Sequence, residues 1–425
     1  PHVALDQTAV FDPLSTGVGL LLGKTAGENA RALLAIWLAG VGMLIFSRRR
    51  GLSTAAGLLA ALAFAFGGWF IAWLGRPMTA AACWLPWILW GLDRQLRDER
   101  PARESLLVAI FVALSLFAGH IETTAHILLL AGAYALFQAW RLEPRRMVRR
   151  AVSAISALVA GIGLGAVAVL PFATFLLGDA GGPGVRGGPD LTTIERIFAG
   201  LQGMGDPARV TRALATAVIP VLNFPRNMAF MSPPPNLAEN TIYVGVGPLL
   251  LALVAAARLR RRPEVAFWIA VAASGLALAL ALPVFHLINQ FPVIRWTAVG
   301  RLRMAYSFGA AMLAGYGLDQ LRSQAWRFRP AMWLVAPLLL AGASWTADLL
   351  SGASTDALVA GLAGWVGGIA FLVALATTPR RLFPTVAVLV CAGELITALH
   401  GVQGSQPVSQ LHPPTGPTDF LRKPP

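Results

Sequence analysis

Charged residues are scarce in this sequence. They make up 13% of its 425 residues, whereas soluble domains carry about 25%. Hydrophobic residues make up 56%, and the mean hydropathy is +0.65. The apolar residues gather in repeated runs of roughly 17–20, which is long enough for a helix to cross a bilayer. These features exclude an ordinary soluble domain and predict an all-α polytopic membrane protein whose first partner is the lipid bilayer.

Cysteine and acidic residues are also few. Cys83 and Cys391 are the two cysteines, and both lie inside apolar runs, so the sequence predicts neither a disulfide framework nor a cysteine metal site. Lys and Arg number 34 against 20 Asp and Glu, which gives a formal net charge of +14. The arginines stand in short clusters between apolar runs, and this arrangement excludes a nucleic-acid partner. No metal triad is visible, and a requirement for a divalent metal stays open.

The apolar runs predict about twelve transmembrane helices. Their expected positions are 31–47, 53–73, 78–93, 105–118, 123–140, 151–176, 244–257, 264–284, 302–321, 331–347, 357–377 and 384–400. The resulting parts are an outer-face loop (1–30), N-terminal transmembrane helices (31–176), a long outer-face loop (177–243), C-terminal transmembrane helices (244–400) and the start of an outer-face domain (401–425). We interpret the sequence as an internal piece of a longer protein.

The distribution of arginine predicts the orientation of these helices. Most of the 34 Lys and Arg fall in alternate loops, at 48–50, 94–103, 141–150, 258–262, 322–329 and 380–381. By the positive-inside rule these loops face the cytoplasm. The other set of loops, which includes both termini and the turn at 119–122, is therefore expected on the outer face.

A short ionisable turn, Ala118-Gly119-His120-Ile121-Glu122, separates two apolar runs. An ionisable group in hydrocarbon is costly, so we expect a tight turn at the water boundary that presents His120 and Glu122 to the aqueous face. A plain polar turn is the alternative. Asn-Gly or Ser-Gly would serve a plain turn equally well, and this favours a functional role for the imidazole and the carboxylate.

Two other outer segments carry candidate binding residues. The long loop contains a possible interfacial helix that Asp190 would cap, or an ordinary packed loop helix. It ends in a proline-rich stretch that directs Glu239, Asn240 and Tyr243 toward the next span. A loop of this length is usually functional or disordered.

The turn at 285–303 holds His286, Arg295, Arg301 and Arg303. Arginines are disfavoured on the outer side, and their planar guanidinium groups match phosphate and carboxylate oxygens. The turn therefore predicts an anion site, unless its arginines pair with acids of the long loop or with lipid headgroups. Arg76 is a further outer arginine and weaker evidence. We expect the turns at 119–122 and 285–303 to converge on one cavity.

One acid, Glu394, lies near the middle of the last expected span. A functional group and a neutral, hydrogen-bonded core group are both open interpretations. We expect it to lie outside the arginine site, because it is too deep for a phosphate held at the membrane interface. Asp319 is expected to be a charge at the end of its helix.

Several short motifs, in order, resemble a known family. The Ala-Gly-His-Ile-Glu turn resembles the AGHPE-type turn of the bacterial YfhO-like multispanning membrane proteins, with Ile121 in place of proline. Similar stretches are 61–68, 85–87, 239–249, the arginine-rich turn from 291 to 301, and Leu-Ala-Gly-Tyr-Gly-Leu-Asp at 313–319. The resemblance covers nearly the whole chain.

The resemblance implies a GT-C type glycosyltransferase fold in the bacterial cytoplasmic membrane, with the active site on the outer face. It further implies a polyprenyl-phosphate-linked sugar as donor and a glycan or cell-envelope polymer as acceptor. The family carries an acidic residue in an earlier outer loop, which would precede Pro1. Asp6 and Asp12 match the tail of that loop and are weaker candidates for the catalytic carboxylate.

The hypothesis that combines these observations is an inverting sugar transfer. Glu122, or an Asp upstream of it, takes a proton from the acceptor hydroxyl, and His120 orients it or helps to bind phosphate. Arginines hold the departing phosphate. The expected substrate-binding residues are Arg295, Arg301, Arg303, Glu239, Asn240, Tyr243, Arg76 and His286.

Two other classes of protein compete with this hypothesis. A transporter or flippase would show internal repeats and several charges at mid-membrane, whereas no clear repeat is visible and Glu394 alone lies at that depth. A scaffold that binds partners through outer domains is disfavoured by the outer arginine cluster.

Overall fold

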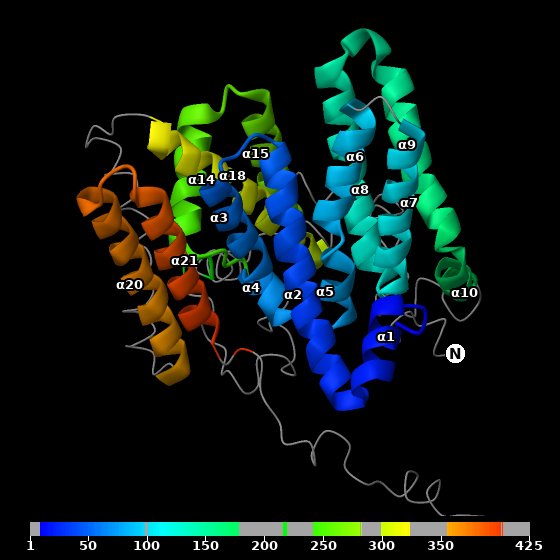
Figure 1. Cartoon of the computed structure of the whole chain (residues 1–425), viewed down its shortest axis with the longest axis horizontal. Coiled ribbons are helices and arrows are strands. Elements are labelled where there is room, and N and C mark those ends of the chain that lie inside the picture. The colour runs from blue at the N-terminus through cyan, green and yellow to red at the C-terminus, as the bar shows by residue number, and fades with distance from the viewer. Residues whose placement is uncertain are drawn as a thin grey trace, which may run out of the picture.

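The computed structural model describes residues 9–97, 101–177, 216–218, 241–280, 282, 299–323, 355–400 and 402, and these residues form helices and no strand. The helices before the long loop are α1 (Pro13–Leu22), α2 (Lys24–Arg49), α3 (Thr54–Ala65), α4 (Gly68–Ala72), α5 (Pro77–Ala82), α6 (Leu85–Arg97), α7 (Pro101–Phe117), α8 (Ile121–Leu142), η1 (Pro144–Arg146), α9 (Met147–Leu164) and α10 (Ala166–Leu177). Those after it are α14 (Val246–Leu259), α15 (Pro263–Ala279), η3 (Val299–Leu302), α18 (Arg303–Ser323), α20 (Thr355–Thr377) and α21 (Phe383–Leu399). The all-α prediction is confirmed for this part of the chain (Figure 1).

The span expected at 331–347 lies outside the described residues. Every other expected span contains a helix, but several of these spans are divided into two helices. The span expected at 53–73 divides into α3 and α4 at Phe66 and Gly67, and the span at 151–176 divides into α9 and α10 at Gly165. In the described residues three helical segments are long and apolar enough to cross a membrane: Thr25–Arg49, Thr54–Ala72 and Pro144–Leu164. A count of about twelve spans therefore stays a prediction.

The segment 1–30 was expected to be a loop, but from Pro13 onward it is almost entirely helical. Asp12 is the N-cap of α1, and its carboxylate accepts hydrogen bonds from the backbone N–H groups of Leu14 and Ser15 at 3.1 and 3.3 Å. Pro13 occupies the first position of this helix, where its missing N–H costs nothing. After Gly23, α2 begins at Lys24. Asp12, a polar residue of this range, is thus a helix cap rather than part of a loop.

The core lies where α18 packs between α14, α15 and α3. Phe46, Tyr134, Trp268 and Phe308 form its aromatic centre, with ring centroids 5.5–6.0 Å apart in the contacting pairs. These four residues come from α2, α8, α15 and α18, so the aromatic centre joins the two halves of the chain.

Packing also explains the Leu-Ala-Gly-Tyr-Gly-Leu-Asp segment of α18. A Cβ atom at Gly317 would collide with the backbone carbonyl of Leu251 on α14, so glycine is needed for this close approach. The carboxylate of Asp319 accepts a hydrogen bond from the Ser53 N–H at 2.8 Å and bonds the Ser53 hydroxyl, at the start of α3. This segment therefore fastens three helices together, and the expectation of a charge at the helix end is refined to a specific contact.

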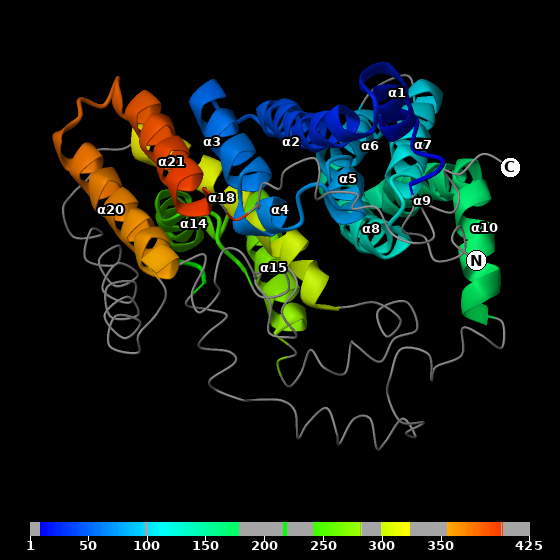
Figure 2. The same ribbon diagram turned by 90° about the horizontal axis from the view of Figure 1, so that it is seen from below.

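Three of the arginine-rich loops bring Arg50, Arg97 and Arg141 together at one end of the molecule, as their alternation predicts. The α8–α9 and α14–α15 connections both lie at the top of Figure 1, and ion pairs join α2 and α8 to α15 there. Figure 2 views the molecule from the opposite end, where α1 packs against α2. Leu20, Leu21 and Val148 are among the large apolar side chains on the outside. A surface of this kind suits a lipid environment better than water.

Candidate active site

Backbone geometry at Gly119 sets up the site. Gly119 has φ of +81°, a conformation that glycine adopts without strain. A Cβ atom there would lie 2.6 Å from the backbone nitrogen of Ala9, so the segment before α1 packs directly on this turn. Helix α8 begins at Ile121, which corrects the turn expected at 119–122: Glu122 belongs to the first turn of the helix.

The structure brings Glu122, His120 and Arg301 together. Arg301 lies in η3, 179 positions after Glu122, and its Nη1 atom donates to Glu122 Oε2 at 2.6 Å. The same Nη1 atom lies 3.2 Å from His120 Nε2. The predicted meeting of the two turns is thus confirmed through Arg301, whereas the cavity between them stays a prediction. The side chains of Arg301 and Glu122 are 17% and 7% exposed, so the pair is mostly buried but remains partly accessible.

His120 does two things in this arrangement. Its Nδ1 atom accepts the N-cap hydrogen bond from the Thr123 backbone N–H at 3.1 Å. An acceptor role at Nδ1 assigns the proton of a neutral ring to Nε2. The Nε2–H group and the Arg301 Nη1–H group are then two donors 3.2 Å apart, and an anionic oxygen that accepts from both would suit such a pair.

Two further residues complete the site and were not predicted from the sequence. The guanidinium carbon of Arg301 lies 5.6 Å from the ring centroid of Trp73, which is a cation–π distance. His126 is buried and interacts electrostatically with Glu122 and Arg301. The spacing of Glu122 and His126, four residues on one helix face, is a signal in the sequence that could have identified His126.

Other described candidates have different contacts. Asp12 is buried and serves as the α1 cap, so its carboxylate is engaged rather than available as a base. Arg303 is also buried, and its Nη1 atom donates to the Gly300 carbonyl at 3.1 Å. Arg76 is exposed at the start of α5, a helix that packs against α8. Of these three, the position of Arg76 is the most compatible with a ligand that approaches from outside.

Tyr243, expected among the substrate-binding residues, is fully buried and donates its hydroxyl hydrogen to Glu394 Oε1 at 2.6 Å. Glu394 also accepts hydrogen bonds from the backbone N–H groups of Val246 and Gly247, the latter at 3.1 Å. These contacts fasten α21 to the first turn of α14, where N–H groups lack partners within the helix. Glu394 is therefore a hydrogen-bonded core group, and its hydrogen bonds do not involve Arg301 or Glu122.

We expect Glu394→Gln to weaken the fold and to spare the chemistry. Glutamine keeps one oxygen but loses the charge-assisted bonds, and the loss should lower the free energy of unfolding by about 1–3 kcal/mol. Thermal unfolding in detergent measures this loss. Activity per folded molecule should stay near that of the parent protein, and an activity loss without a change in stability would contradict the assignment.

Asp6, Glu239, Asn240, His286 and Arg295 lie outside the described residues, so their proposed roles stay predictions. Among the described residues no three His, Cys, Asp or Glu side chains are grouped as metal ligands.

Comparisons with known proteins give limited information. No family model matches the sequence, and no curated protein matches it. Two solved structures of ArnT from Cupriavidus metallidurans are similar. The apo structure shares 15% identity over 92% of this chain and 64% of that chain, with a TM-score of 0.45. The structure bound to undecaprenyl phosphate shares 14% identity over 94% and 66%, with a TM-score of 0.44. The chain thus spans less than two thirds of ArnT, and a likeness at this level assigns neither a function nor a residue role.

Proposed function

We propose that this protein is a membrane glycosyltransferase of GT-C type that transfers a sugar from a polyprenyl-phosphate donor to a glycan or cell-envelope acceptor. The reaction would take place on the outer face of the bacterial cytoplasmic membrane. The observation that supports this proposal most is the contact of Arg301 with both Glu122 and His120. It joins a phosphate-binding group to a carboxylate that can act as a base. The resemblance to YfhO-like proteins is consistent with it.

In the proposed reaction the acceptor hydroxyl oxygen attacks the anomeric carbon of the donor sugar, and the bond from that carbon to the phosphate oxygen breaks. Glu122 takes the hydroxyl proton. Arg301 and the Nε2–H group of His120 stabilise the negative charge that the leaving polyprenyl phosphate gains. Direct attack inverts the anomeric centre.

The ion pair between Arg301 and Glu122 suggests how binding and proton transfer are coupled. The Arg301 guanidinium group, 2.6 Å from Glu122, occupies the carboxylate while the donor is absent. A donor phosphate competes with Glu122 for Arg301. Donor binding would therefore release the carboxylate for catalysis at the moment when the acceptor needs it.

The test is sugar transfer by the full-length protein in proteoliposomes, with a labelled sugar on polyprenyl phosphate. We expect the label to move to an acceptor together with release of polyprenyl phosphate. Movement of an unchanged lipid-linked sugar across the bilayer, with no bond cleaved, would instead establish the flippase alternative. Among described residues, the internal hydrogen bonds of Glu394 give that alternative no support.

A further inference from the structure

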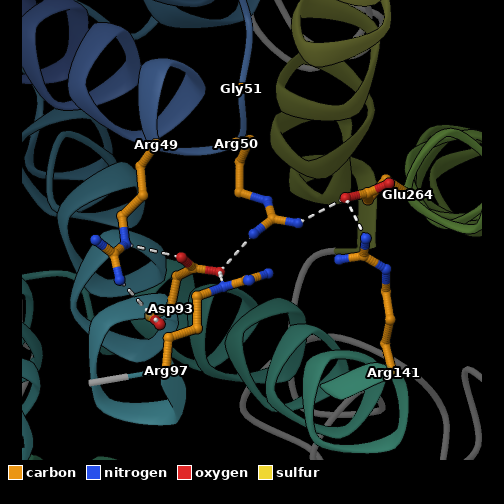
Figure 3. A pocket seen from close by; sticks show the side chains of 7 residues that line it. All are labelled: Arg49, Arg50, Gly51, Asp93, Arg97, Arg141 and Glu264. Carbon is orange, nitrogen blue, oxygen red and sulfur yellow. Dashed lines mark hydrogen bonds and ion pairs between the residues drawn. The ribbon is translucent and has the colours of Figure 1, made fainter. Parts of the chain in front are cut away.

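A second charged site lies at the arginine-rich end. Figure 3 shows an open hollow of about 420 Å³ where α2, α6, α8 and α15 meet. Its lining residues are Arg49, Arg50, Gly51, Asp93, Arg97, Arg141 and Glu264. Four guanidinium groups against two carboxylates leave the hollow with a formal positive charge.

The two carboxylates of the hollow are already occupied. Asp93 is fully buried and accepts from Arg49, Arg50 and Arg97 at 2.8, 2.7 and 3.0 Å. It accepts in addition from the Tyr134 hydroxyl at 3.0 Å. Glu264 accepts from Arg50 and Arg141, each at 2.9 Å. Donors therefore exceed the acceptors that the lining supplies.

Three of the guanidinium groups lie close together at the hollow. The guanidinium groups of Arg50, Arg97 and Arg141 converge on its middle, as Figure 3 shows. Arg97 and Arg141 are each about one third exposed, at 31% and 32%, so an anion can reach them. The buried Nε atom of Arg50 has no hydrogen-bond partner among the residues that the structure describes.

Arg50 remains a cation in this setting. Burial alone would lower the pKa of Arg50, but Tyr134, Asp93, Tyr316 and Glu264 raise the pKa of the guanidinium group above its ordinary value. A permanent positive charge with donors in a planar fork matches the oxygens of a phosphate group, with which arginine forms paired hydrogen bonds.

We propose that this hollow binds a phosphate group, supplied by an anionic lipid headgroup or by a soluble phosphate. Basic pockets between helices on the arginine-rich side of a membrane protein suit anionic headgroups. The site is distinct from the Arg301 cluster, which stands at the other end of α8. It does not depend on the proposed sugar transfer.

The test is a titration of the full-length protein in neutral detergent, followed by calorimetry. The probes are short-chain phosphatidylglycerol, the matched zwitterionic short-chain phosphatidylcholine, and inorganic phosphate. Binding of phosphatidylglycerol without phosphate identifies a lipid headgroup, and binding of inorganic phosphate identifies a soluble ligand. Binding of neither, or equal binding of both lipids without binding of phosphate, overturns the proposal.

Two variants that change the charge of the hollow in opposite directions distinguish a ligand site from a structural ion-pair network. Arg141→Gln should weaken binding about tenfold or more, because it removes a charge-assisted contact. Glu264→Gln should tighten binding about threefold or more, because it removes a negative charge and releases two guanidinium groups.

The matched control is Arg145→Gln, which changes an exposed arginine of η1 outside the lining. Unfolding measurements confirm that each variant is folded. A purely structural network would lower stability in both variants and leave affinity unchanged.

Discussion

Replacing Arg301 with alanine should greatly reduce the proposed sugar transfer. The change removes the group that would hold the donor phosphate, and it leaves Glu122 without the guanidinium group that lies 2.6 Å from it. Loss of one buried charge partner typically costs 2–5 kcal/mol. If the loss acts on the transition state, the rate falls by tens-fold to thousands-fold. Initial rates in proteoliposomes measure it.

Arg301→Lys should give a graded loss rather than full rescue. Lysine keeps the charge, but its ammonium group cannot form the paired contact of a planar guanidinium. Arg322→Ala is the matched control, because Arg322 is exposed at the far end of α18, the helix that follows η3. Equal activity of Arg301→Ala and Arg322→Ala, with both proteins folded, would remove Arg301 from the mechanism.

Glu122→Gln should reduce transfer by about a hundredfold to ten-thousandfold, the range expected for loss of a general base. Glutamine preserves the size of the side chain and an oxygen that can accept from Arg301, but it cannot take the acceptor proton. The Michaelis constant for the lipid donor should change much less than the turnover number. This separation distinguishes a base from a residue that only positions Arg301.

Glu122→Asp provides the matched comparison for this prediction. It retains a carboxylate but shortens the reach by one methylene, so partial activity is expected. Near-normal turnover in Glu122→Gln would assign Glu122 a role in shaping the first turn of α8. The base would then be sought among Asp6 and other acids outside the described residues.

The meeting of Glu122 and Arg301 could be predicted from the sequence, because the alternation of loops between the two ends is a strong constraint. Helices that alternate in direction place every second loop at the same end, so His120, Glu122 and Arg301 had to share an end whatever the packing. The same argument correctly grouped three of the arginine-rich loops, whose Arg50, Arg97 and Arg141 meet around Asp93 and Glu264. The face of the membrane on which each end lies remains a prediction.

What could not be predicted depends on contacts between distant helices. Tyr243 was assigned to the substrate because it follows Glu239 and Asn240, yet its hydroxyl meets Glu394, 151 positions later. No local pattern encodes such a pair. The contact of Trp73 with Arg301 could not be predicted from the sequence for the same reason. Helix breaks at Gly67 and Gly165 were missed because hydropathy runs continue across them.

The charge network around Arg50 also has a consequence for how the chain is made. Asp93 lies 43 positions after Arg50, whereas Glu264 lies 214 positions after it. During synthesis the ends of α2, α6 and α8 can therefore assemble around Asp93 well before α15 has emerged. Until Glu264 arrives, the growing chain carries more uncompensated positive charge at this end than the finished protein. A surplus of this kind would hold the end on its side of a membrane while the later helices insert, and Glu264 would then neutralise part of it once the topology is fixed.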